Sequence, residues 1–359
     1  MRKLSKLFAA GALVALSSVL VGATASRAGV QGRSGAIAFL RSDAELGRGS
    51  AGLFTIRADG SGFRRLTPSG SDIGLFEWAP GGSRIAYVDR RGALWLVGPE
   101  GTGRRLLAAS SPVRFPWSLS WSPDGKAIAV LARDPAEGPP TPRNAFSDLR
   151  IYVVPTDGGT PRRLPSGDVI EFDWAPRGDE IAYGSGTGLQ RIIRTDGSKP
   201  RPFFQRPPSS GKGMPIWSPD GTHLGFVGGV RRGRFTDRYA GIYVADADGS
   251  NLHLVTSHAY NEYGFAWSPD GRWILYGRAN REGVYVIRAN GRNNHRLTRD
   301  SPTPSGFPAL SWAPDGHSIA YETDRTGNGD IYVIGADGHN QVQLTSSPAS
   351  DSVPSWQPR

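Results

Sequence analysis

Three carboxylic acids stand just before recurring tryptophans and could take part in acid–base chemistry. Glu77 precedes Trp78 directly, and Glu171 and Asp173 precede Trp174. A pair of facing carboxyl groups can serve as general acid and general base, as in carbohydrate lyases and glycoside hydrolases. The sequence does not show whether these groups face each other. A polar lining of a central channel is the alternative interpretation.

Other catalytic and metal-binding patterns are absent from the sequence. It has no Cys and no Gly-x-Ser-x-Gly nucleophile motif. Its histidines are His223, His253, His258, His295, His317 and His339. None of them shows the His-x-His or His-x-x-x-His spacing that preassembles a metal site. Asp246 and Asp248 are too few for a calcium loop and are typical of a hairpin turn. We therefore expect no metal and no cofactor.

Two groups of residues could bind a partner. The first is the densest basic and aromatic group of the chain and contains Arg231, Arg232, Arg234, Phe235, Arg238 and Tyr239. The second contains His258, Tyr260, Glu262 and Tyr263. Guanidinium groups and aromatic rings suit an acidic or sugar-like partner. Ordinary solvated loops are the alternative for these residues.

A repeat must position all of these residues, because one short pattern recurs seven times. Its tryptophans are Trp78, Trp121, Trp174, Trp217, Trp267, Trp312 and Trp356. A Pro-Asp-Gly type turn follows each of the first six, as at 123–125, and then a strand such as Ile85-Ala86-Tyr87. Such self-similarity predicts a repeat architecture in which the shared residues serve packing.

Each repeat carries four strand signals. The third strand is β-branched and aromatic, as at 331–334, and ends in an Asp-Gly or Asn-Gly hairpin turn. The fourth is of the Arg-Leu-Thr type, as at 296–298. Four antiparallel strands, repeated seven times, predict an all-β, closed seven-bladed β-propeller. Both chain ends share the last blade, since Trp356 supplies the first strand that is missing before Ile37.

The strand order also predicts where a binding site lies. Within each blade, the turns from the first to the second strand and from the third to the fourth strand emerge on one face of the ring and are short. The other two connections emerge on the opposite face and include the long segments 134–148, 205–214, 228–240 and 257–263. Loops on a rigid scaffold commonly carry function. We expect binding at the channel mouth on this long-loop face.

The first 28 residues read as a secretory signal peptide. Arg2, Lys3 and Lys6 precede an apolar run from Leu7 to about Val21 and small residues at 23–25. Residues 29–359 then form a single propeller domain. We expect an extracytoplasmic monomer (periplasmic, in the cell envelope or secreted) without stable membrane insertion.

The formal net charge is +10, which raises the possibility of a polyanionic partner. The arginines concentrate on fourth strands, as at 64–65, 104–105 and 162–163. Charges on an exposed sheet edge prevent edge-to-edge pairing. A solvated rim is therefore favoured over a polyanion-binding ring, and no nucleic-acid partner is expected.

The combined pattern resembles the TolB-type (WD40-like) propeller repeat, and the best match runs from Trp312 to Gly338. TolB is a periplasmic interaction protein of a cell-envelope complex, and similar propellers gate serine peptidases. TolB has six blades and a separate N-terminal α/β domain, and this sequence has seven repeats and no such domain before Ile37. The favoured hypothesis is an exported, non-catalytic propeller that binds a protein or an acidic or sugar polymer of the envelope. The alternative is a carbohydrate-active lyase or hydrolase with its site in the channel.

Overall fold

The computed structural model describes residues 35–42, 51–109, 118–133, 149–185, 189–198, 200–204, 214–229, 240–257, 262–278, 283–299 and 309–359. The predicted signal peptide lies outside these ranges. All regular secondary structure within them is β-strand. None of the described residues forms a helix long and apolar enough to cross a membrane.

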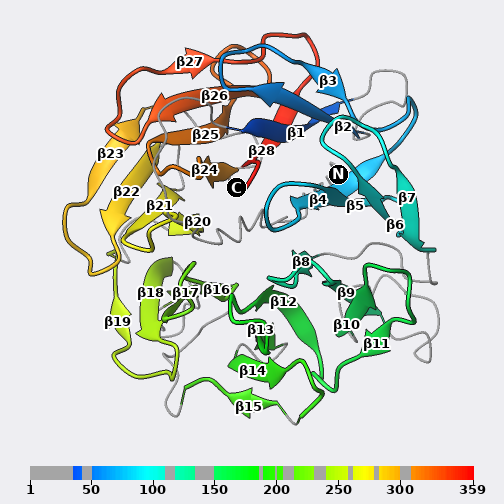
Figure 1. Cartoon of the computed structure of the whole chain (residues 1–359). Helices are drawn as coiled ribbons and strands as arrows, with labels where there is room; N and C mark the ends of the chain where they lie inside the picture. The colour runs from blue at the N-terminus through cyan, green and yellow to red at the C-terminus, as the bar shows by residue number, and fades with distance from the viewer. Residues whose placement is uncertain are drawn as a thin grey trace, which may run out of the picture.

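The strands form seven four-stranded antiparallel sheets around a central axis, so the predicted seven-bladed propeller is confirmed (Figure 1). The innermost strands are β4 (Ile73–Trp78), β8 (Leu119–Trp121), β12 (Val169–Trp174), β16 (Ile216–Trp217), β20 (Glu262–Trp267), β24 (Leu310–Trp312) and β28 (Asp351–Trp356). The second strands are β1 (Ala36–Ser42), β5 (Ile85–Asp89), β9 (Ala127–Arg133), β13 (Glu180–Ser185), β17 (His223–Gly229), β21 (Trp273–Arg278) and β25 (Ser318–Thr323). The third strands are β2 (Ala51–Arg57), β6 (Leu94–Val97), β10 (Leu149–Pro155), β14 (Gln190–Arg194), β18 (Ala240–Asp246), β22 (Val284–Arg288) and β26 (Asp330–Gly335). The outer strands are β3 (Arg64–Arg65), β7 (Arg105–Ala108), β11 (Arg162–Arg163), β15 (Arg201–Pro202), β19 (His253–Leu254), β23 (His295–Thr298) and β27 (Val342–Gln343).

The blade that both chain ends share, counted from here on as the first blade, forms as the sequence predicts. Its strand order is β28-β1-β2-β3, and Ile37 pairs with Trp356. At the opposite end of the same pair of strands, Arg41 pairs with Asp351. The register shifts between these two points, which marks a bulge in the ladder. The ring therefore closes through non-covalent pairing of β28 with β1.

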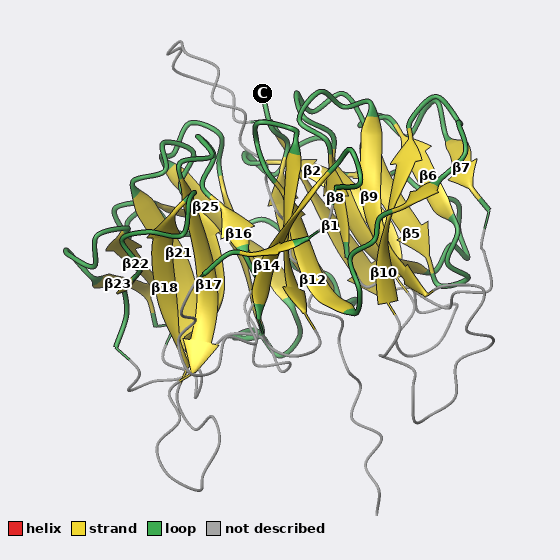
Figure 2. Cartoon of the chain, turned by 90° about the horizontal axis from the view of Figure 1, so that it is seen from below, coloured by secondary structure: helices red, strands yellow, loops and turns green. Residues whose placement is uncertain are grey.

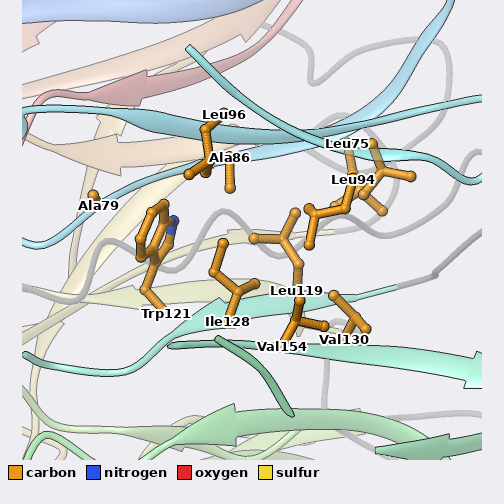
Figure 3. Close-up of a cluster of buried hydrophobic side chains, with 11 residues drawn as sticks. Leu75, Ala79, Ala86, Leu94, Leu96, Leu119, Trp121, Ile128, Val130 and Val154 are labelled. Atoms are coloured by element: carbon orange, nitrogen blue, oxygen red, sulfur yellow. The ribbon is translucent and has the colours of Figure 1, made fainter. Parts of the chain in front are cut away.

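The recurring tryptophans pack between blades. Trp121 lies beside Ile128 of its own blade and faces Ala86 and Leu96 of the preceding blade (Figure 3). All seven are buried, with at most 7% of the side chain exposed. Four of the tryptophans also make a hydrogen bond to the neighbouring blade. In each, the indole Nε1–H donates to the backbone carbonyl of the residue just before that blade's tryptophan. The four bonds, 3.1–3.3 Å long, are Trp78–Ser355, Trp121–Glu77, Trp267–Ile216 and Trp312–Ala266. The indole thus joins apolar packing to a hydrogen bond across the seam.

Short turns lie along one face of the ring, the upper face in Figure 2. In the turn after Trp121, the Asp124 carboxylate accepts from Ser122 Oγ at 2.7 Å and from the Lys126 amide at 3.0 Å. Gly125 has φ +69°, a conformation that Gly adopts without steric cost. Asp248 likewise accepts from the Ser250 amide at 2.8 Å. These carboxylates are turn-forming groups, which agrees with the hairpin interpretation of 246–249.

The basic rim does more than keep the outer edges in solution. Arg64 forms an ion pair with Glu100 of the next blade at 2.9 Å. Arg105 donates to the Thr156 carbonyl and Arg162 to the Thr195 carbonyl, each across a seam. His253 Nε2 lies 3.1 Å from the Ala289 carbonyl of the following blade. The first residue of these outer strands therefore connects neighbouring blades at the rim.

Candidate functional site

Five of the seven tryptophans are preceded by a buried polar residue on the inner wall of the ring, and these residues are Glu77, Ser120, Asp173, Ser311 and Ser355. Asp173 Oδ2 accepts from the Trp217 amide of the next blade at 2.8 Å. Ser311 Oγ accepts from the Trp356 amide at 3.0 Å, and Ser120 Oγ from the Trp174 amide at 3.4 Å. Strand alternation places this side chain on the face of the blade that meets its neighbour. These groups therefore fasten one inner strand to the next.

Two of the predicted acids, Glu77 and Asp173, are buried in this wall, each 5% exposed. Burial raises the pKa of Asp173 to about 7, against the lowering effect of the Trp217 amide. Burial also raises the pKa of Glu77 well above its ordinary value, and the negative charge of Asp173 raises it further. The two acids are therefore electrostatically coupled, although a whole blade separates their strands β4 and β12. Both are closed off from solvent.

Glu171 is the third predicted acid and differs from the other two. Its side chain is partly exposed, and burial of the carboxyl raises its pKa to about 7. It follows Ile170, which is 42% exposed and lies where the pairing of β12 with β13 shifts register. A carboxyl that titrates near neutrality on a partly exposed residue can act as a general base. Of the three acids, only Glu171 has this combination.

Glu322 is a fourth acid in the inner part of the ring, and the sequence analysis missed it. It is 8% exposed on β25, and burial raises its pKa to about 8. The signal was available by comparing repeats, because the residue after the Ile-Ala-Tyr motif is Val88 in the second blade and Leu131 in the third. A carboxyl at that register contradicts the apolar pattern.

The predicted partner-binding residues are only partly within the described ranges. Arg231, Arg232, Arg234, Phe235, Arg238, Tyr239, His258 and Tyr260 lie outside them. Glu262 and Tyr263 belong to β20, where they pair with Arg278 and Gly277 of β21. In the described part of the chain, no group of three or more His, Cys, Asp or Glu side chains is arranged to hold a metal ion.

Comparisons with known proteins bear on the repeat. No protein-family model matches the chain. Its sequence is 30% identical over 228 residues to the Tol-Pal system protein TolB of Anaeromyxobacter dehalogenans strain 2CP-C, which covers 62% of this chain and 49% of that protein. This chain carries TolB-type propeller repeats. The chain spans about half the length of the TolB relatives it matches. It is also 26% identical over 258 residues to the uncharacterized protein Atu1656 of Agrobacterium fabrum, and this match covers 67% of this chain and 80% of that protein.

Solved structures with the same fold include TolB and oligogalacturonate lyases. TolB from Acinetobacter baumannii superposes with a TM-score of 0.56 at 17% identity, covering 91% of this chain and 67% of that one. An oligogalacturonate lyase in complex with manganese gives 0.65 at 16% identity, covering 79% and 82%. The oligogalacturonate lyase of Vibrio parahaemolyticus gives 0.68 at 14% identity, covering 82% and 85%. At these identities the likeness establishes the propeller fold alone.

Proposed function

We propose that this chain is an exported, non-catalytic TolB-type propeller that binds a protein or an acidic or sugar polymer of the cell envelope. The observation that carries the proposal is the use of the inner wall. Asp173, Ser120 and Ser311, which could do chemistry in the channel, accept amide hydrogen bonds of the adjoining blade. A catalytic carboxyl must reach its substrate, whereas Glu77 and Asp173 are buried between blades.

The cellular location is part of the same proposal. The N-terminal 28 residues have the charged start, apolar run and small-residue site of a secretory signal. The similarity to Tol-Pal system proteins supports a place outside the cytoplasm. We propose that the exported domain acts as a monomer.

We place the binding surface on the long-loop face, in segment 230–239 with its four arginines and two aromatic residues. The opposite face is occupied by tight turns whose carboxylates are engaged locally, as Asp124 and Asp248 are. The rim arginines Arg105 and Arg162 are engaged with neighbouring blades. The proposal for 230–239 rests on its composition, which is the densest basic and aromatic group of the chain.

A capture experiment tests this proposal. Tagged protein is incubated with envelope extract, cross-linked and recovered, and co-purifying protein and polymer are identified. The variant with Arg231, Arg232 and Arg238 changed to Ala should capture at least about tenfold less at unchanged melting temperature. The control changes Lys126, Arg194 and Arg272 to Ala, which removes the same charge from exposed positions of the short-turn side. Equal loss in the control would assign capture to net charge, and equal capture by both variants would refute the placement.

A second candidate function is a carbohydrate lyase or hydrolase that uses Glu171 as general base. Its pKa of about 7 and its partial exposure favour this residue over Glu77 and Asp173. The purified protein would be incubated with polygalacturonate and other acidic polysaccharides, and new unsaturated or reducing ends measured. If the candidate is correct, Glu171→Gln lowers the rate by about 10²–10⁴-fold without loss of folding. Absence of product with every polymer removes it.

A further inference from the structure

The strand that closes the ring, β28, is held to the seventh blade by three of its amides. The Asp351 amide donates to the Gly329 carbonyl at 2.7 Å, and the Trp356 amide to Ser311 Oγ at 3.0 Å. Between them, the Val353 amide donates to Glu322 Oε2 at 3.2 Å. Two of these acceptors do not titrate. The third is a carboxyl whose charge depends on pH.

The backbone at Val353 is held in an unusual conformation for this contact. Its φ is +55°, a left-handed value that β-branched residues rarely adopt. Val353 lies where the ladder between β1 and β28 shifts register, and Pro354 follows it without an amide hydrogen to donate. The bulge therefore turns the Val353 amide out of the ladder toward Glu322. Local strain of this kind persists only where surrounding contacts support it.

Glu322 is surrounded mainly by other acids. Asp351 faces it from β28 and Asp324 from the connection that follows β25, and the negative charges of both oppose its ionisation. Asp330 begins β26, where it accepts from Thr326 Oγ1 at 2.6 Å, and its charge in turn acts on Asp351. The adjoining strand β24 brings no titratable residue. Two cations lie nearby in the fold.

Both nearby cations are engaged elsewhere. Arg41 of β1 forms a two-point ion pair with Asp351, with both N–O distances 2.6 Å. Arg325 lies over the Tyr332 ring at 4.1 Å. Among the described residues, the groups that shift the pKa of Glu322 are the Val353 amide, which donates to it, and the acids Asp324 and Asp351, and neither guanidinium is one of them.

We propose that the Glu322 carboxyl is a proton-dependent fastening of β28, so that the ring is firmly closed while Glu322 is protonated and opens more readily at this seam once the proton is lost. Opening β28 transfers Glu322 from a buried site among acids to water, where a carboxyl ionises near its ordinary pKa. The Val353 amide by itself favours the ionised carboxylate, but burial and the two neighbouring acids outweigh it, so opening releases a proton from Glu322 between the ordinary pKa and the raised one. Because β28 pairs with β1 without a covalent link, this strand can open while the other blades stay folded.

Hydrogen exchange tests this proposal directly. Protection of the β28 amides is measured by mass spectrometry from about pH 5 to pH 9, after correction for the intrinsic exchange rate. One proton released on opening gives a loss of protection of about tenfold per pH unit up to about pH 8, where the loss levels off. Strand β24, the inner strand of the neighbouring blade, provides the internal comparison.

Two variants separate the Glu322 contact from the other acids. Glu322→Gln keeps the acceptor for Val353 but cannot ionise, so the loss of protection that extends to about pH 8 should disappear. Any slope that remains at lower pH comes from Asp351 of β28, whose pKa burial also raises. Glu171→Gln removes an acid with a similarly raised pKa from a different blade and should leave the β28 slope unchanged. The proposal is overturned if the slope up to about pH 8 survives in Glu322→Gln, if β24 shows the same slope as β28, or if wild-type β28 shows none.

Discussion

Single residues of this propeller have a role that only their place in the repeat explains. Each recurring tryptophan packs its ring against the neighbouring blade, and most also donate from the indole nitrogen. Trp267 donates to the Ile216 carbonyl of the preceding blade, while Trp174 donates to the Gly178 carbonyl of its own turn. Tryptophans at the same register thus stabilise the contact between two blades in one case and a turn within a blade in another.

Truncation of these tryptophans should be costly. We expect Trp174→Ala and Trp267→Ala each to lower the unfolding free energy by about 3–5 kcal/mol, because each leaves a cavity between blades. Urea titration of the purified variants measures the change. Trp267→Phe is the informative comparison, since it keeps an aromatic ring at this position but removes the bond to Ile216 and part of the indole volume, and it should therefore cost less than Trp267→Ala. An unchanged midpoint for both Ala variants would show that the ring is not part of the packing.

At the scale of the element, the strand types, their number and their order could be predicted, because alternation, turn residues and a sevenfold repeat all point to the same blade. The pairing of Ile37 with Trp356 followed from counting strand types alone. Connections across seams could not be predicted in the same way. Arg162 reads as a solvated edge residue, and only the curvature of the ring brings it to the Thr195 carbonyl of the next blade.

The acids show the same division between local and spatial information. The sequence identified Glu77 and Asp173 by their position before a tryptophan, but their electrostatic coupling depends on how blades are arranged. The sequence did not indicate Glu322 as a site residue, because a single acid within a strand is typical of an exposed position. Its burial arises from the closing strand, whose pairing partner is distant in the chain.

For the whole molecule, the buried acids predict a stability that falls as pH rises. Asp173 and Glu171 titrate near 7 and Glu322 near 8 in the folded state, above their values in an unfolded chain. Between about pH 4 and the raised pKa of each acid, the unfolded chain has released a proton that the folded chain still holds. Each rise in pH within this range therefore lowers the free energy of unfolding. The exposed turn carboxylates of Asp59 and Asp248 have lowered pKa values, so their contribution is lost only at more acidic pH, below about 4.

Replacing one buried acid should reduce this slope. Asp173→Asn keeps an oxygen that can accept from the Trp217 amide but cannot ionise. We expect it to match the wild type near pH 4 and to be more stable by about 2–4 kcal/mol near pH 8, as a shift of about three pKa units implies. Urea titrations at several pH values measure both slopes. Asp248→Asn serves as the control, because removing an exposed turn carboxylate should leave the decline in stability between pH 5 and 8 intact. A wild-type protein that is equally stable near pH 4 and near pH 8 would contradict the burial of the acids.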